Sequence, residues 1–129
     1  MIPMELSLSI LNTSDKPIYR QLYEQLAFQV VTGKLEGGYP LPPIRALASS
    51  LGISVISIKR AWEELERDGF IVTMVGRGCF VSELSDDERL KRRRELALSE
   101  LKASFASLRK LELTKDELIA LISDNYEEV

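Results

Sequence analysis

The cations and hydroxyls between residues 45 and 77 are the side chains best suited to chemistry, since the usual catalytic types are scarce. The 129 residues include no histidine and one cysteine. This excludes histidine-based acid–base catalysis and makes a zinc site untenable. No glycine-rich phosphate loop and no nucleophile beside a base is visible. We therefore expect no catalytic residue, no metal and no cofactor, and interpret the cations and hydroxyls as binding groups.

The stretch from Leu41 to Val81 predicts two helices, a tight turn and a hairpin. The first helix begins at Pro42-Pro43, since proline suits the first helical position, and Gly52 ends it. Ser54 is a suitable N-cap for the second helix, which ends at Asp68-Gly69. Both helices have apolar residues spaced i, i+3, i+4, i+7, the pattern of one buried face. These residues are Ile44, Leu47, Ala48 and Leu51, then Ile58, Ala61, Trp62 and Leu65.

The turn between these helices is too short for them to lie back to back. A short turn with one glycine is typical of a helix-turn-helix, whose second helix enters the DNA major groove by its N-terminus. At about 100° per residue, Ile56 and Arg60 point away from the apolar face, with Ser57 and Lys59 beside them. Ile56 is then either a scattered surface hydrophobe or a contact for a thymine methyl group.

Two apolar runs around Gly76-Arg77-Gly78 predict a β-hairpin from Phe70 to Val81. Arg77 at its tip either reaches a minor groove or a phosphate, or is an ordinary exposed turn residue. Behind a helix-turn-helix, the first interpretation is favoured. The single cysteine, Cys79, excludes an intramolecular disulfide and is expected to be a small buried residue rather than a redox sensor.

These motifs together resemble the winged-helix domain of GntR-type bacterial transcription regulators, over residues ~16–82. The likeness lies in LPPIRALASSLGIS, ELERDGFI and GRGCFV, and in KPIYRQLYEQLAFQVVTGKL before them. The segment at residues 6–10, which precedes the helix in KPIYRQLYEQLAFQVVTGKL, resembles the YtrA subfamily. Pro43 departs from the family, which often has a small residue there, and Val55 stands where the family often has arginine. The resemblance implies DNA contacts at Arg45, Ser54, Ile56, Ser57, Lys59, Gly76 and Arg77, to which the helix geometry adds Arg60.

The N-terminal part predicts a strand and a helix that support this unit. Residues 6–10 alternate apolar and polar, which indicates a short strand with Leu6, Leu8 and Ile10 facing inward. Ser14 or Asp15 is a candidate cap for a helix that has Pro17 in its first turn and ends near Thr32. Its apolar residues recur every four positions and are expected to form core under the helix-turn-helix: Ile18, Leu22, Leu26 and Val30.

Beyond Val81 the sequence predicts two further helices. Capping boxes at Ser85/Glu88 and Thr114/Glu117 begin them, and the first extends to about Lys110. So small a helical pair cannot bury its apolar residues alone. A second copy of the chain would cover them, which predicts a homodimer; packing back onto the winged helix is the alternative. The expected dimerisation residues are Leu98, Leu101, Phe105, Leu108, Leu118, Leu121 and Ile122.

Charge is unevenly distributed. The net charge is -3, yet residues 15–81 hold eight Lys and Arg against seven Asp and Glu. DNA binding by such a domain needs a local patch, which Arg45, Lys59, Arg60 and Arg77 could supply. The run from Lys91 to Arg94 is either a solvated helix start or a set of auxiliary phosphate contacts. No apolar run approaches ~18 residues and no signal peptide is evident, which favours the cytoplasm and no membrane.

The sequence therefore predicts a mainly α protein with a small β wing. Residues 1–82 would form a winged helix-turn-helix with a short N-terminal strand, and 83–129 a helical hairpin that serves as a dimerisation arm. The expected function is a sequence-specific DNA-binding transcription regulator, a repressor on a palindromic operator. The alternative is a winged helix used only for protein contacts, suggested by Glu63, Glu64 and Glu66. The arm alone is too small to enclose a typical pocket, which leaves a small-molecule effector open.

Overall fold

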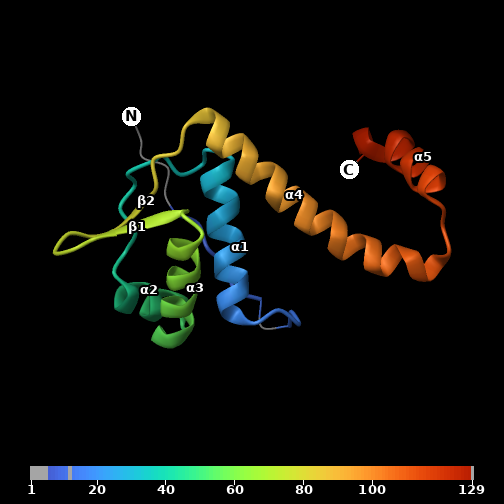
Figure 1. The fold of residues 1–129 in the computed structure, drawn as a ribbon. Helices are drawn as coiled ribbons and strands as arrows, with labels where there is room; N and C mark the ends of the chain where they lie inside the picture. Colours follow the sequence, from blue (N-terminus) through green and yellow to red (C-terminus); the bar gives the residue numbers. More distant parts are fainter. Residues whose placement is uncertain (1–5, 12, 129) are drawn as a thin grey trace. The chain divides into compact units, whose positions relative to one another are not determined.

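The computed structural model describes residues 6–11 and 13–128 and is mainly helical with one small sheet, which confirms the predicted fold class. Figure 1 shows the elements in order. They are α1 (Ile18–Val31), α2 (Ile44–Leu51), α3 (Val55–Arg67), β1 (Ile71–Met74), β2 (Gly78–Val81), α4 (Asp86–Leu108) and α5 (Lys115–Asn125), with short 3₁₀ turns at Arg109–Leu111 and Tyr126–Glu128.

The chain forms two compact units, one through Arg93 and one from Arg94 onward. The division falls inside α4. Beyond residue 82, where we predicted the first domain to end, the first turns of α4 still belong to the first unit.

The core of the first unit lies between α1 and α3. Leu22 and Leu26 of α1 and Ile58 and Leu65 of α3 are all fully shielded from solvent. Ala61 and Trp62 complete the buried face of α3, as predicted from the i, i+3, i+4, i+7 spacing. In α2 the same spacing holds less strictly: Leu47 and Ala48 are buried, whereas Ile44 and Leu51 are half-buried.

The turn between α2 and α3 has the predicted caps, Gly52 at the end of α2 and Ser54 at the start of α3. Gly52 adopts φ 68° and ψ 35°, a left-handed conformation that closes α2 and costs glycine little. Ser54 is then the N-cap of α3, and its side chain accepts a hydrogen bond from the Ser57 N–H at 3.2 Å. One residue, Ile53, separates these two caps, so the chain changes direction sharply between the helices.

The wing is an antiparallel hairpin anchored at its base. Ile71 pairs with Val81 in the buried base of the hairpin, and Met74 pairs with Gly78 near the tip. The loop that precedes α2 lies along the other edge of β2: Val81 N–H donates to the Tyr39 carbonyl, and Leu41 N–H donates to the Cys79 carbonyl, both at 2.9 Å. These bonds fix the base of the wing to the helix-turn-helix.

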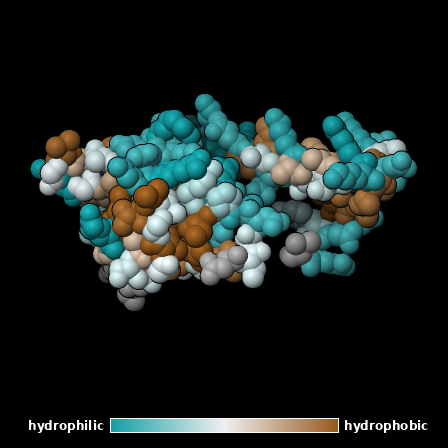
Figure 2. Space-filling view, turned by 90° about the horizontal axis from the view of Figure 1, so that it is seen from below, coloured by the Kyte–Doolittle hydropathy of each residue, from teal (hydrophilic) through white to brown (hydrophobic). Residues whose placement is uncertain are grey.

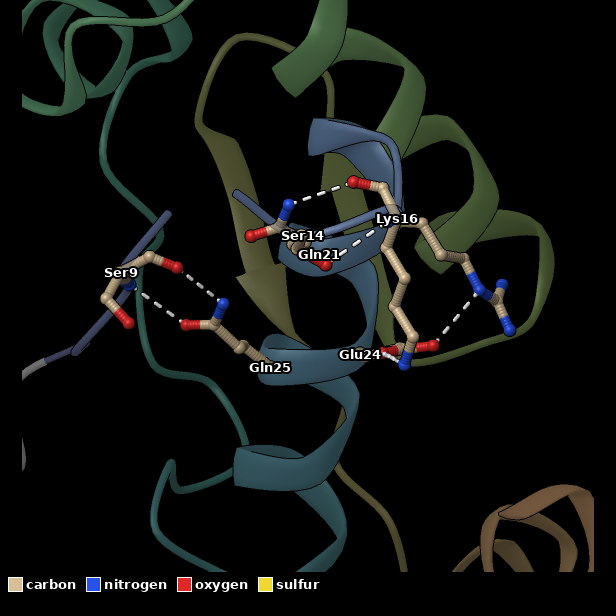
Figure 3. A network of polar contacts seen from close by, with 7 residues as sticks. Ser9, Ser14, Lys16, Gln21, Glu24 and Gln25 are labelled. Atoms are coloured by element: carbon tan, nitrogen blue, oxygen red, sulfur yellow. Dashed lines mark hydrogen bonds and ion pairs between the residues drawn. The ribbon is translucent and has the colours of Figure 1, made fainter. Parts of the chain in front are cut away.

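The predicted strand at residues 6–10 is wrong, because this segment pairs with side chains rather than with another strand. Three glutamines of α1 hold its backbone. Figure 3 shows the central pair, in which Ser9 N–H donates to Gln25 Oε1 at 2.9 Å and Gln25 Nε2 donates to the Ser9 carbonyl. Gln29 binds Ser7, and Gln21 binds Leu11, in the same two-bond manner. The predicted alternation of inward and outward side chains is confirmed: Leu6, Leu8 and Ile10 are half-buried, and the residues between them are exposed.

The start of α1 also differs from the prediction. Pro17 occupies the N-cap position and no side chain caps the helix. The Ser14 hydroxyl instead accepts from the Lys16 N–H at 3.1 Å, which closes the turn before the helix. Gln21 Nε2 donates to the Lys16 carbonyl at 2.9 Å, so one glutamine joins the turn, the N-terminal segment and α1.

Helices α4 and α5 each begin at a hydroxyl side chain that caps the helix. The Ser85 hydroxyl accepts from the Glu88 N–H, and the Thr114 hydroxyl from the Glu117 N–H, which confirms the hydroxyl half of each predicted capping box. Helix α4 ends at Leu108, just short of the predicted Lys110. No residue of α4 or α5 is buried. Within the described residues no helix is long and apolar enough to cross a membrane.

Replacing Gln21 by alanine tests the side-chain pairing of the N-terminal segment. Gln21 is buried and makes three hydrogen bonds, so Gln21→Ala leaves backbone groups of Leu11 and Lys16 without partners. We expect a loss of about 1–3 kcal/mol in the free energy of unfolding by urea denaturation, and faster hydrogen exchange at the Leu11 amide. Gln25→Ala, which removes two more exposed bonds of the same network, should cost less than Gln21→Ala. Equal stability of Gln21→Ala and the parent would contradict this arrangement.

Replacing Ser54 tests the cap that begins α3. Ser54→Ala removes the acceptor for the Ser57 N–H and should lower the free energy of unfolding by about 1 kcal/mol. Ser54→Asp keeps an acceptor at the N-cap and should retain the parent's stability. Thermal or urea unfolding of the three proteins measures this, and an alanine variant as stable as the aspartate variant would refute the cap.

Candidate nucleic-acid interface

The first turn of α3 is exposed and held by its own cap. The Ser54 and Ser57 hydroxyls lie 3.0 Å apart and the cap bond adds to this contact. Ile56 is 78% exposed, and Lys59 is exposed beside it, whereas Ser57 is half-buried. Because α3 buries its opposite face, its first two turns present hydroxyls, one cation and exposed apolar side chains to the outside.

Hydrophobic side chains gather at this end of the molecule. Figure 2 looks from below, toward the end at which α3 begins in Figure 1, and shows a hydrophobic area over the helix-turn-helix. Exposed Val55 and Ile56 are part of the surface at the start of α3. The sequence analysis noted only that Val55 stands where the family often has arginine, and did not predict its exposure. Its position directly after the N-cap was the signal that its side chain would be accessible.

Arg45, Gly76 and Arg77 lie on two other exposed elements of the same unit. Arg45 is in the first turn of α2, and Gly76 and Arg77 form the tip of the wing, where Arg77 N–H donates to the Met74 carbonyl at 2.9 Å. Gly76 has φ 78°, which the tight tip requires and which side-chain-bearing residues rarely adopt. Val75, which the sequence analysis did not single out, is 99% exposed beside them.

The cations of the winged helix fall into two groups. Arg45, Lys59 and Arg77 make no ion pair, ring contact or side-chain hydrogen bond with any residue that the structure describes. The other cations between residues 15 and 81 are engaged with a carboxylate or an aromatic ring: Lys16, Arg20, Lys34, Arg60 and Arg67. Three of the four cations predicted to contact DNA are therefore available to an external anion.

Arg60 is the exception among the predicted residues. Its guanidinium carbon lies 3.7 Å from the centre of the Tyr19 ring, and its Nε is 4.0 Å from Glu64 Oε1. It is exposed but lies toward α1 instead of extending freely from α3. Spacing within α3 indicates the i,i+4 pair with Glu64 but could not reveal the contact with Tyr19, because Tyr19 lies on α1.

Arg92 belongs to the basic run in α4 and is used inside the protein. Its guanidinium donates to the Asp68 carbonyl at the end of α3 and lies 4.9 Å from the centre of the Phe70 ring. The Tyr23 hydroxyl donates to the Asp68 carboxylate at 2.5 Å. Burial, reinforced by this bond, raises the pKa of Tyr23 above its ordinary value. These contacts join the start of α4 to α1 and to the end of α3.

Cys79 is half-buried rather than buried. Its Sγ lies 3.3 Å from the Thr73 hydroxyl across the wing. No cluster of possible metal ligands occurs in the part of the chain that the structure describes.

Comparisons with known proteins agree with this geometry. The family model of bacterial regulatory proteins, gntR family, matches residues 18–81. The chain is 32% identical over 109 residues to the uncharacterized HTH-type transcriptional regulator YhcF of Bacillus subtilis (strain 168), covering 82% of this chain and 87% of YhcF. It is 37% identical over 70 residues to the HTH-type transcriptional repressor YtrA of the same organism, and spans about half of each chain, 54%.

A solved structure supports the same assignment. The GntR family transcriptional regulator from Listeria monocytogenes superposes with a TM-score of 0.72 at 29% identity, over 86% of this chain and 96% of that one. The winged helix, the exposed start of α3 and the match to YhcF over most of both chains lead to one conclusion. This chain belongs to the gntR family of bacterial regulatory proteins, as a YtrA-like transcription regulator with a winged-helix DNA-binding domain and not as an enzyme.

Proposed function

We propose that this protein represses transcription by binding a palindromic operator as a homodimer. The observation that carries the DNA contact is the set of unpaired cations. Arg45, Lys59 and Arg77 come from α2, α3 and the wing tip, and none is neutralised by a described residue of the chain. A duplex supplies the phosphates that such side chains bind.

Each candidate residue has a role that follows from its place. Ser57 and Lys59 in the first turns of α3 are placed to contact base edges in the major groove, and exposed Ile56 to contact a thymine methyl. Arg45 at the start of α2 suits a phosphate that borders the groove, and Arg77 a phosphate or the minor groove. Ser54 and Gly76 contribute through the backbone, at the helix N-terminus and the wing tip.

Repression is the regulatory direction that the relatives support. YtrA and NagR of Bacillus subtilis (strain 168), which are 37% and 36% identical over 70 and 84 residues, are both named transcriptional repressors. This chain spans 35% of NagR, so NagR supports only what the winged helix does. An operator in chromosomal DNA places the proposed action in the cytoplasm.

Neutralising Arg45 and Arg77 tests the proposed DNA contact. Arg45→Ala and Arg77→Ala each remove one phosphate partner per protomer, hence two per proposed dimer, so each should reduce the magnitude of the slope of log K against log salt concentration by about 1.8. The probe is a duplex that the parent protein selects from a random-sequence library, and fluorescence anisotropy at several salt concentrations gives the slope. Arg67→Ala is the matched control, because Arg67 is paired with Asp68 at the far end of α3.

Two results would contradict this interface. If neither variant changed the slope, Arg45 and Arg77 would not face phosphates. If the parent itself selected no duplex, the alternative of a protein-contact module would replace DNA binding, and the acidic second half of α3 would become the surface to test.

The proposed dimer rests on the exposed apolar residues of α4 and α5. Phe105 is 37% exposed and Leu101 and Leu98 nearly half exposed, although they repeat at the 3–4 spacing of a helix–helix contact. The corresponding residues of α5 are Leu118, Leu121 and Ile122, none of them buried. A second copy covering these residues would also supply a second reading helix, as a two-fold operator requires.

Charging the apolar stripe of α4 tests the dimer. Phe105→Glu should shift the protein toward monomer, raising the dimer dissociation constant roughly a hundredfold or more, since a buried carboxylate at a helix–helix contact costs several kcal/mol. Ala103→Glu places the same charge on the opposite side of α4 and should leave the parent's oligomeric state unchanged. Sedimentation equilibrium measures both. A parent that is monomeric at micromolar concentration would exclude the dimer.

A further inference from the structure

The contact between Tyr19 and Arg60 joins α3 to α1. At 3.7 Å, the guanidinium carbon of Arg60 is at stacking distance from the Tyr19 ring, closer than in the other cation–ring contacts of the described chain, which measure 4.9 to 5.1 Å. The pair with Glu64 is at 4.0 Å and lies on an exposed side chain, so it contributes little on its own. The ring is therefore what holds the guanidinium in place.

The stack leaves only part of the guanidinium open. One face is against Tyr19 and the Nε edge faces Glu64, while the Arg60 side chain remains 58% exposed. Reading a guanine needs an arginine that extends from the helix into the groove with its fork toward the base edge. An arginine held sideways against α1 cannot do so, but its terminal nitrogens can still bind a phosphate oxygen.

The position of the stack along the two helices favours a phosphate. Tyr19 is in the first turn of α1, and α1 and α3 begin at the same end of the unit (Figure 1). Arg60 is also the last cation of α3 before Glu63, Glu64 and Glu66. Carboxylates are repelled by the phosphate strands, so the groove-bound part of α3 must end near Arg60. In a bound duplex, the DNA strand that borders the groove would lie at that level.

We propose that Tyr19 is a positioning residue that holds Arg60 against α1 so that the guanidinium binds a phosphate beside the groove rather than a base within it. This inference rests on the proposed DNA-binding function and assigns two residues of one phosphate site. It narrows the general DNA contact that the sequence analysis gave to Arg60 to a phosphate contact.

The experiment compares Arg60→Ala, Tyr19→Leu and Tyr19→Phe with the parent on two duplexes, one selected from a random library and one of unrelated sequence. Arg60→Ala should weaken binding to both by a similar factor, roughly three- to tenfold at ~0.1 M salt, and lower the magnitude of the salt slope by about 1.8, because the dimer loses one phosphate contact per protomer. Tyr19→Leu should give roughly half or more of the change seen for Arg60→Ala. The double variant Tyr19→Leu/Arg60→Ala should lose no more affinity than Arg60→Ala alone. Tyr19→Phe keeps the ring and should match the parent.

Phe28→Leu is the matched control, because it removes a similar surface contact, with Lys34, from the other end of α1. It should leave the affinity and the salt slope unchanged. A methylphosphonate scan of the selected duplex adds a direct readout: one neutral linkage should weaken the parent but not Arg60→Ala. Thermal unfolding of each variant shows that a loss of binding does not come from a loss of fold.

The outcomes separate this inference from the proposed function. A parent that binds no duplex refutes the DNA-binding function. A parent that binds, with Arg60→Ala relaxing the preference at one base pair, shows a base contact and refutes the phosphate site. An Arg60→Ala slope change that Tyr19→Leu does not reproduce refutes the positioning role of Tyr19.

Discussion

The packing of α3 against α1 is the constraint on which the proposed DNA-contact surface at the start of α3 depends. Ile58 and Leu65 on α3 meet a face of α1 that includes Leu22 and Leu26, and all four are fully buried. A helix has one rotation about its axis that buries such a set, and turning it by one residue, about 100°, would bring Lys59 into the core. The residues presented to the outside are thus determined by those enclosed. The caps at Gly52 and Ser54 then fix where this surface begins along the chain.

Helix α1 stabilises a second element with different chemistry. Its glutamines at positions 21, 25 and 29 bind alternate residues of the N-terminal segment. Four helical residues rise about 6.0 Å and two extended residues about 6.7 Å, so the two repeats stay in step over three pairs. Because each amide both donates and accepts, it satisfies the N–H and the carbonyl of one residue as a neighbouring strand would. An extended segment is therefore held without a sheet, on the flank of the helix that supports α3.

The predictable parts of the fold are those that local periodicity and capping residues determine. The face of α3, the turn at Gly52, the wing tip and both arm caps follow from residues within four positions of one another. The alternation of residues 6–10 indicated an extended backbone, but a period of two does not name the partner. The stack of Arg60 on Tyr19 and the contact of Arg92 with Asp68 join positions far apart in sequence. Single-helix spacing marked Arg60 as exposed and could not distinguish an extended side chain from one held sideways.

The distribution of paired and unpaired cations explains how a chain of net charge -3 can serve a gntR-family regulator. A cation beside a carboxylate offers a phosphate little net attraction, since the two fields partly cancel at a distance. Lys16 and Arg20 share Glu24 in this way, and Figure 3 shows Lys16 beside Glu24. Arg45, Lys59 and Arg77 have no such neighbour among the described contacts, so in the proposed interface no ion pair offsets their attraction for an approaching duplex. The acids in the second half of α3 would act in the opposite sense and limit how far that helix can follow the groove. In this proposal, attraction at the start of the helix and repulsion farther along it together select one docking depth, which total charge could not indicate.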